Sequence, residues 1–317
     1  MVTGYIIRRI LQSLITVFIV TIVSFGMMHL VPTGLVHALV GARDANNPQA
    51  IAQVTHELGL DKPLVEQYWI WLTHLLQGNF GYDYTYNQSV GSLIAGTLGQ
   101  SMYIVFLALI LSVLIAVPMG LIQATKRNTW VDHSFTTFSF IGYSIPTFFI
   151  GWLLLDIFED NLNWIPEGSQ IASFHDAFTQ PVQLILPVFT LVFGQVAGYS
   201  RYMRSAILDQ ITQDYVRTAV AKGANRRRVL YRHVLRNAMI PMVTLMGLSL
   251  PGLVGGALLV EYVFNIHGIG LLTTNAALQN DYGVTLATTL LAAVMTVIGS
   301  LIADVSYAAL DPRVRLN

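Results

Sequence analysis

Residues 214–241, DYVRTAVAKGANRRRVLYRHVLRNAMIP, decide the fold, because they form a strongly basic insert in a chain that is 54% hydrophobic. Apolar residues recur at helical spacing in the first half of the insert, which predicts a helix over about 209–222; they are Tyr215, Val216, Ala219 and Val220. Gly223 is typical of the left-handed residue that ends a helix, and Asn225 is typical of a residue that caps the next one. That second helix carries Arg226, Arg227, Arg228, Arg232 and Arg236. Such a helical pair can project from a membrane and fit a groove on a soluble partner.

The composition is that of a polytopic membrane protein. Only 11% of the 317 residues are charged, against about 25% in a soluble domain. The net charge is zero, so bulk electrostatics give no reason to expect nucleic acid as a partner. The chain has no cysteine, which excludes disulfides and thiolate metal sites. The apolar run over 10–31 is longer than the ~7–15 residues of a signal-peptide core. We therefore expect a retained first span, with a cleaved signal peptide as the alternative.

Six apolar runs are long enough to cross a membrane as helices that rise ~1.5 Å per residue. They cover about 5–31, 101–123, 135–158, 184–203, 239–263 and 284–307. If the N-terminus is cytoplasmic, fifteen of the 17 Lys and Arg residues fall inside, and only Arg43 and Lys62 lie outside. Arg226 to Arg228 either bind anionic membrane lipid or only set this orientation. The sequence therefore predicts an all-α, multi-pass protein of the plasma or inner cell membrane, with both termini in the cytoplasm.

The external segment over 33–100 is too long to be a bare loop. Asn47 and Pro48 are typical of a helix start, and Gly59 of its end. A second helix is expected between Pro63 and Gly78, and its sequence is rich in aromatic residues. This helix either lies at the outer membrane boundary or packs against the protein's own spans.

Prolines and glycines interrupt two of the spans. Pro146 lies inside the third run, where it produces either a packing kink or a pore-lining bend that moves during transport. The fifth run holds Pro251, Gly255 and Gly256. It either packs tightly against another helix or lines a transport path beside a second subunit.

The chain lacks the patterns of the common catalytic sites. It has no phosphate-binding loop, no HExxH, no GxSxG and no paired Cys–His set. Its eight histidines are scattered without the spacing of metal ligands. We therefore expect no catalytic residue, metal or cofactor in this chain, so that any ATP hydrolysis that powers it takes place in a partner.

The insert resembles the cytoplasmic EAA loop of binding-protein-dependent ABC importer permeases. That pattern is Glu-Ala-Ala, three residues, Gly, nine residues, Ile-x-Leu-Pro. Ala219, Gly223 and Leu235 match it at the family's spacing, whereas the positions that depart from it are Arg217, Thr218, His233 and Arg236. The sequence DYVRTAVAKG followed by RHVLRNAMIP is similar to that of the B-type subunit in the oligopeptide, dipeptide and nickel branch of this family. LGLDKPLVEQYWIWL over 58–72 and GNFGYDY over 78–84 resemble the external segment of the same family.

This resemblance implies the type I ABC importer permease fold. It divides the chain into 1–100, the first transmembrane helix with an external helical segment, and 101–317, a five-helix core with the coupling loop at about 209–237. The implied partners are a second homologous permease, two ATP-binding subunits that hold ATP and Mg, and an external substrate-binding protein. Closure of the ATPases would move the loop and switch the spans from inward-open to outward-open. The expected contacts with the ATPase are Arg217, Ala219, Lys222, Gly223 and Ala224.

The stretch EYVFN at 261–265, followed by HGIGLL, resembles an external segment of the family. It is expected to be a gate, a docking surface for the binding protein, or a plain structured loop. The residues named for a pathway or gate are Pro146, Pro251, Gly255, Gly256 and Glu261.

The substrate that the resemblance implies is an oligopeptide or dipeptide, with nickel or glutathione as alternatives within the same importer class. An ion-driven secondary transporter fits less well, because paired intramembrane charges and inverted repeats are not evident. A membrane scaffold without a translocation path is a third class, and the interrupted spans argue against it.

Overall fold

The computed structural model describes residues 2–30, 47–57, 61–83, 86–165, 171, 173–249, 252, 257–279 and 281–310. These ranges are almost entirely helical, and they contain one two-stranded hairpin. Besides the long helices described below, the shorter elements are α3 (Pro48–Glu57), α4 (Leu64–Leu76), α8 (Phe174–Thr179), α10 (Asp214–Ala221), α11 (Arg226–Arg228), the π-helical turn η2 (Val229–Val234) and α15 (Ile269–Leu278). The hairpin strands are β1 (Tyr82–Asp83) and β2 (Gln88–Ser89).

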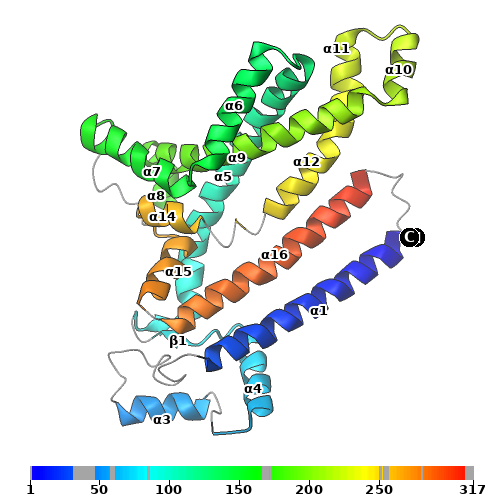
Figure 1. Ribbon diagram of the computed structural model, residues 1–317. Helices are drawn as coiled ribbons and strands as arrows, with labels where there is room; N and C mark the ends of the chain where they lie inside the picture. The colour runs from blue at the N-terminus through cyan, green and yellow to red at the C-terminus, as the bar shows by residue number, and fades with distance from the viewer. Residues whose placement is uncertain are drawn as a thin grey trace.

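Four helices of the described ranges are long and apolar enough to cross a membrane. They are α1 (Val2–His29), α5 (Val90–Thr125), α9 (Pro181–Ile211) and α16 (Tyr282–Leu310), at the first, second, fourth and sixth predicted runs. α5 and α9 pack together in the middle of the molecule, and α1 lies beside α16 along one edge (Figure 1). α5 approaches α9 closely at Gly120, where a Cβ atom would lie 2.9 Å from the Ser200 carbonyl oxygen.

The third predicted run forms two helices rather than one. α6 (Trp130–Ser144) and α7 (Thr147–Leu155) are bent by 92° relative to each other across Ile145 and Pro146. Pro146 has no N–H to continue the helix, and its ring favours the extended conformation that Ile145 adopts (φ −87°, ψ 127°). The expected interruption at Pro146 is therefore confirmed, and it is a bend of 92° between two helices. The predicted end of the run falls in a π-helical turn, η1 (Asp156–Asn161).

The fifth predicted run is covered at its two ends by α12 (Leu235–Ser249) and α14 (Leu258–Val263). Pro251, Gly255 and Gly256 lie outside the described residues. The described ranges therefore hold four spanning helices, or five if the bent pair of α6 and α7 counts as one span. A total of six spans stays a prediction.

The two helices predicted between the first two long runs begin at their predicted start signals, while Gly59, the predicted end of the first of them, lies outside the described residues. α3 begins at Pro48, α4 begins directly after Pro63, and Gly78 follows α4 with a φ of 78°. α4 packs against α1, because the Tyr68 hydroxyl lies 2.9 Å from Thr21 Oγ1 and the Tyr68 ring meets the Phe25 ring edge-on. The opposite face of α4 stays exposed. Packing on the protein's own first span is thus one role of this helix.

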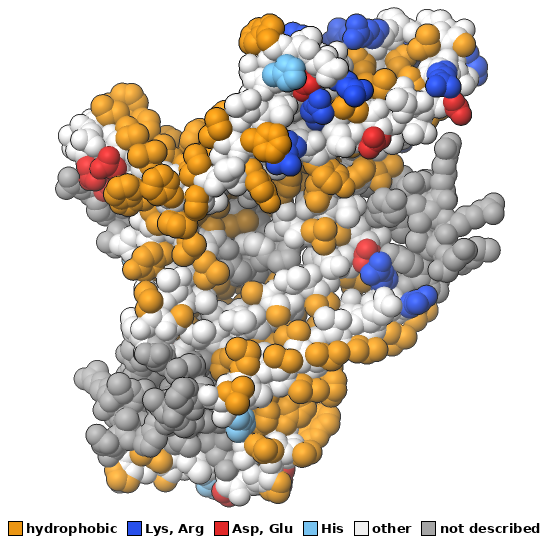
Figure 2. Space-filling model, in the orientation of Figure 1, with side chains coloured by type: hydrophobic (Ala, Val, Ile, Leu, Met, Phe, Trp, Pro, Cys, Tyr) orange, Lys and Arg blue, Asp and Glu red, His pale blue; other side chains and the backbone are white. Residues whose placement is uncertain are grey.

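Large apolar side chains remain exposed along the outside of the helices. Figure 2 shows them gathered along α1 and over α7. On α1 they recur on several sides of the helix and include Leu11, Leu14, Ile15 and Phe18. A surface of this kind is expected to face lipid or another transmembrane subunit.

A buried acid and a partly buried one meet where the hairpin packs on the last long helix. Asp83 of β1 is 4% exposed, and Asp281 directly precedes α16. Asp281 Oδ1 accepts a hydrogen bond from the Val284 N–H at 3.1 Å, and Asp83 Oδ1 accepts one from the Tyr86 N–H at 3.2 Å. Burial raises the pKa of Asp281 to about 6, and the neighbouring Asp83 adds to the rise.

This pKa predicts that the protein becomes less stable as the pH rises from 4 to 7. A carboxyl whose pKa is raised by folding stabilises the fold fully below its unfolded pKa, and the contribution is lost as the pH passes through about 6. After allowing for solvent screening, the loss is roughly 1 kcal/mol. Asp281→Asn keeps a side chain that can cap α16 and should remove most of this pH dependence. Thermal unfolding of the purified protein at pH 5 and pH 7 measures it, and an Asn variant with the wild-type pH dependence would contradict the assignment.

Candidate functional site

The basic insert forms a short helical pair that continues directly from a long helix. α9 ends at Ile211, and only Thr212 and Gln213 separate it from α10. The predicted start of the first helix at about 209 is therefore wrong, because residues 209–211 belong to α9. Asp214 lies in the first turn of α10, where a negative charge interacts favourably with the helix dipole. α10 is thus joined to the end of α9 by only two residues.

Gly223 ends α10 in the predicted left-handed conformation, with a φ of 80°. Its N–H donates to the Val220 carbonyl at 2.9 Å, and the Ala224 N–H donates to the Ala219 carbonyl at 3.1 Å. This pair of bonds is a Schellman motif, which satisfies the last carbonyls of the helix. A Cβ atom at position 223 would meet nothing within 4 Å. The backbone angle, and not the space, therefore requires glycine here.

Asn225 caps the second helix as predicted. Its Oδ1 accepts a hydrogen bond from the Arg228 N–H at 2.8 Å. The chain then runs through α11 and η2 directly into α12. The helical pair is therefore joined at one end to α9 and at the other to α12.

The inner face of the pair is anchored in a buried apolar cluster. Val216, Val229 and Val234 are 8%, 6% and 0% exposed. They pack with residues of α5, α9 and α12, which are Leu121, Ala124, Met203, Ile207, Ala238 and Met242. Because protein interiors are closely packed, this cluster holds the pair firmly against the long helices.

The outer face presents what we call the tip surface, formed by Arg217, Val220, Lys222 and Gly223, all exposed. Val220 is 57% exposed, although the sequence placed it with the inward apolar stripe. The helical spacing does not predict this exposure, because the exposure of Val220 depends on how α10 packs against its neighbours. Ala219 and Ala224, which were also predicted as contacts, lie partly buried against the apolar cluster.

Basic side chains gather at this end of the molecule. Figure 2 shows Lys and Arg around α10, α11 and the nearby parts of α6 and α9, whereas α3 and α4 lie at the opposite end (Figure 1). The surface around the tip is therefore basic and mixed with exposed large hydrophobic side chains, among them Val220 and Tyr231. An acidic groove with an apolar pocket would match it.

Two of the predicted pathway residues lie in described segments. Pro146 precedes α7 at the 92° bend. Glu261 is 0% exposed in α14, which packs against α7. Its Oε1 accepts from the Ala257 N–H at 3.1 Å, and its Oε2 accepts from the N–H groups of Gly270 and Leu271 at 2.7 and 3.3 Å. Glu261 thus caps the start of α15 and joins it to α14, while its assignment to a pathway stays a prediction.

The two glycines of the HGIG stretch make room for this carboxylate. A Cβ atom at Gly270 would lie 2.8 Å from Glu261 Oε2 and 2.8 Å from Leu258 Cα. A Cβ atom at Gly268 would collide with Glu261 Oε2 and Ser101 Oγ. Ser101 Oγ in turn accepts from the Ile269 N–H at 2.8 Å. The glycines are therefore required by the close approach of a buried acid, a contact that no local sequence pattern predicts.

Comparisons with known proteins cover the whole chain. The family described as "Binding-protein-dependent transport system inner membrane component" matches residues 116–316, and the corresponding N-terminal family matches residues 1–105. The oligopeptide transport system permease protein AppB of Bacillus subtilis is 37% identical over 98% of this chain and 99% of its own length. A putative peptide permease protein of Brucella suis is 37% identical over 99% of both chains. The glutathione transport system permease protein GsiC of Salmonella choleraesuis is 36% identical over 98% of this chain and 99% of its own.

Proposed function

The chain belongs to the binding-protein-dependent transport system inner membrane component family, and from this we propose that it is a transmembrane permease subunit of an ATP-driven ABC importer of peptides. It forms the uptake pathway together with a second, related permease. Two ATP-binding subunits, which hold ATP and Mg, contact the tip surface, and an external binding protein delivers the peptide. The observation that carries this proposal is the tip surface itself, an exposed contact surface on a helical pair whose inner face is firmly packed.

The proposed orientation places the tip surface and both termini in the cytoplasm of a cell-membrane protein. The gathering of Lys and Arg at the end that holds α10 and α11 supports it (Figure 2). α3 and α4 then lie on the external side, where the binding protein would dock. In this orientation the ATP-binding subunits reach α10 from the cytoplasm without crossing the membrane.

The proposed mechanism is alternating access. Closure of the ATP-binding subunits displaces α10, and the permease pair switches from an inward-open to an outward-open state. α10 is suited to this role because it has one exposed face and because two residues connect it to α9. No chemical step takes place in this chain, so its residues bind partners and change conformation only.

An oligopeptide or dipeptide is the proposed substrate class. The names of the relatives include an oligopeptide permease and a glutathione permease, and glutathione is itself a small peptide. Glutathione is therefore the second candidate. Selectivity is expected to lie mainly in the binding protein, which is a separate chain.

Uptake by the complete assembly tests the proposal. The chain is purified with its co-expressed partners, reconstituted in liposomes, and given a labelled tetrapeptide with the binding protein. We expect uptake that requires ATP on the side of the tip surface and that persists when ion gradients are collapsed. Competition by unlabelled dipeptide, glutathione and a nickel chelate then ranks the substrates. Uptake that runs on an imposed ion gradient without ATP would contradict the proposal and favour a secondary transporter.

A further inference from the structure

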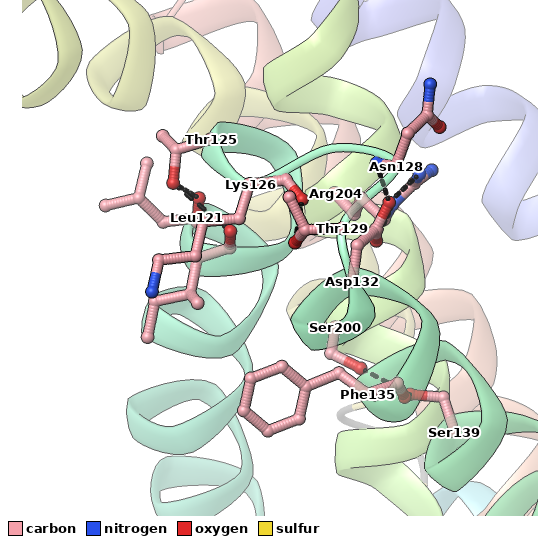
Figure 3. A network of polar contacts seen from close by, with 11 residues as sticks. Leu121, Thr125, Lys126, Asn128, Thr129, Asp132, Phe135, Ser139, Ser200 and Arg204 are labelled. Atoms are coloured by element: carbon pink, nitrogen blue, oxygen red, sulfur yellow. Dashed lines mark hydrogen bonds and ion pairs between the residues drawn. The ribbon is translucent and has the colours of Figure 1, made fainter.

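α6 and α9 are joined by matching contacts on one face of each helix. Arg204 donates two hydrogen bonds to the Asp132 carboxylate, Nε to Oδ1 and Nη2 to Oδ2, both at 2.8 Å. Further along, the hydroxyls of Ser139 and Ser200 lie 3.1 Å apart. Figure 3 shows both contacts side by side on the two helices. We call these four residues the α6–α9 clamp.

A third contact between α6 and α9 follows the first two along the helices. A Cβ atom at Gly142 would lie 3.2 Å from the Ala197 Cβ atom, so the two helices remain close beyond the serines. Positions rise along α6 while they fall along α9, as expected of antiparallel neighbours. The contacts therefore follow one continuous seam rather than a single point.

The clamp is buried and its ion pair is geometrically specific. The side chain of Asp132 is 3% exposed and that of Arg204 is 28% exposed. The Asn128 N–H also donates to Asp132 Oδ2 at 3.0 Å, which fixes the carboxylate from the turn before α6. Asn128 has a φ of 61°, an angle that asparagine tolerates better than most residues. A bidentate guanidinium–carboxylate pair fixes orientation as well as distance.

The clamp lies between the tip surface and the bend at Pro146. Arg204 is about two helical turns before the end of α9, after which α10 begins. Asp132 is near the start of α6, and the far end of α6 is the 92° bend. A rigid connection between α6 and α9 would therefore carry a displacement of α10 to the bent pair.

We propose that Asp132 and Arg204 are positioning residues that make α6, α9 and α10 move as one body, so that movement of the tip surface by an ATP-binding subunit reaches the bend at Pro146. This inference rests on the proposed function. It assigns to the ion pair a role in coupling, measured as peptide transported per ATP hydrolysed.

The first test breaks the ion pair in the reconstituted assembly. Asp132→Asn should still co-purify with the ATP-binding subunits and hydrolyse ATP, but its uptake per ATP should fall by roughly 5- to 150-fold, the typical range of coupling between two sites. Arg204→Gln should do the same, and the double variant should be no worse than either single one. The matched control is Arg9→Gln, which breaks the ion pair between Arg9 of α1 and Asp304 of α16 (3.2 Å) and should leave uptake per ATP unchanged.

The second test replaces the ion pair by a covalent link. The chain has no cysteine, so Ser139→Cys with Ser200→Cys provides a single pair of thiols. Oxidation of this pair should leave transport intact in the otherwise wild-type chain, and should restore uptake per ATP in the Asp132→Asn background until a reductant is added. This readout stays informative if Asp132→Asn alone assembles poorly, because the link in the wild-type background tests the rigid-body claim directly.

The outcomes separate this inference from the proposed function. If oxidation of the cysteine pair stops ATP-driven uptake, α6 and α9 must separate during transport and the inference fails while the importer stands. If Asp132→Asn and the control Arg9→Gln show the same uptake per ATP, the clamp has no special role in coupling. If the wild-type assembly takes up no peptide with ATP, the proposed function fails instead.

Discussion

Gly223→Pro is expected to abolish the connection between ATP hydrolysis and uptake while the protein stays folded. Proline holds φ near about −65° and has no N–H, a combination that costs about 3 kcal/mol or more in a helix. Position 223 needs a φ of 80° and an N–H that donates to the Val220 carbonyl. The last turn of α10 should therefore unwind and displace Val220 and Lys222. ATPase activity stimulated by the binding protein should fall to the unstimulated level, which an assay on the reconstituted assembly measures.

Gly78 supplies a matched control for this substitution. It follows α4 with a φ of 78°, its N–H donates to the Leu75 carbonyl, and the Asn79 N–H donates to the His74 carbonyl, so the motif is the same. A Cβ atom there would also meet nothing within 4 Å. Gly78→Pro should perturb α4 and leave binding of the ATP-binding subunits unchanged. Loss of that binding in the Gly78 variant, or normal coupling in the Gly223 variant, would contradict a special role for the tip surface.

Glu261→Ala is expected to give the largest loss of stability of any single substitution considered. It leaves the N–H groups of Ala257, Gly270 and Leu271 without their carboxylate acceptor inside the protein. Each buried unsatisfied group costs about 1–3 kcal/mol, so the total for the three groups is on the order of 3–9 kcal/mol. α15 should separate from α14, and the temperature of thermal unfolding in detergent should fall sharply.

Two further variants show whether the loss comes from the carboxylate cap. Gly270→Ala places a Cβ atom 2.8 Å from both Glu261 Oε2 and Leu258 Cα, and should be destabilising because it pushes the carboxylate and the α14 backbone away from α15. Glu66→Ala removes an exposed glutamate from its ion pair with Lys62 and should change stability little, because water screens exposed ion pairs. Equal unfolding temperatures for the Glu66 and Glu261 variants would contradict the capping role.

The features that could be predicted from the sequence are those set by local backbone chemistry. Gly223, Asn225, Pro48 and Gly78 each mark a helix end through a φ angle, a side-chain cap or a missing N–H, and the structure has helix ends at all four. Four of the six long apolar runs likewise became long helices, because in a bilayer the backbone must satisfy its own hydrogen bonds. The family resemblance supplied the partners and the substrate class, which no local pattern specifies.

The features that could not be predicted depend on contacts between distant parts of the chain. Asp132 and Arg204 are 72 positions apart, and nothing in either local sequence indicates the pairing. Pro146 signalled an interruption but gave no means to tell a shallow kink from a bend of 92°. Glu261 was named for a pathway or gate because its stretch, EYVFN at 261–265, resembles an external segment of the family. Its backbone partners, Gly270 and Leu271, come from the next helix.

The most direct measurement of the central claim is cross-linking from the tip surface. Because the chain has no cysteine, Val220→Cys introduces a unique thiol at an exposed site, and Leu76→Cys introduces one at a 78% exposed site on α4. With a short thiol-reactive photo-cross-linker in the intact assembly, we expect position 220 to form an adduct with the ATP-binding subunit and position 76 to form none. Gly223→Pro should remove the adduct from position 220. An ATP-binding subunit that cross-links to position 76 and not to position 220 would contradict the account.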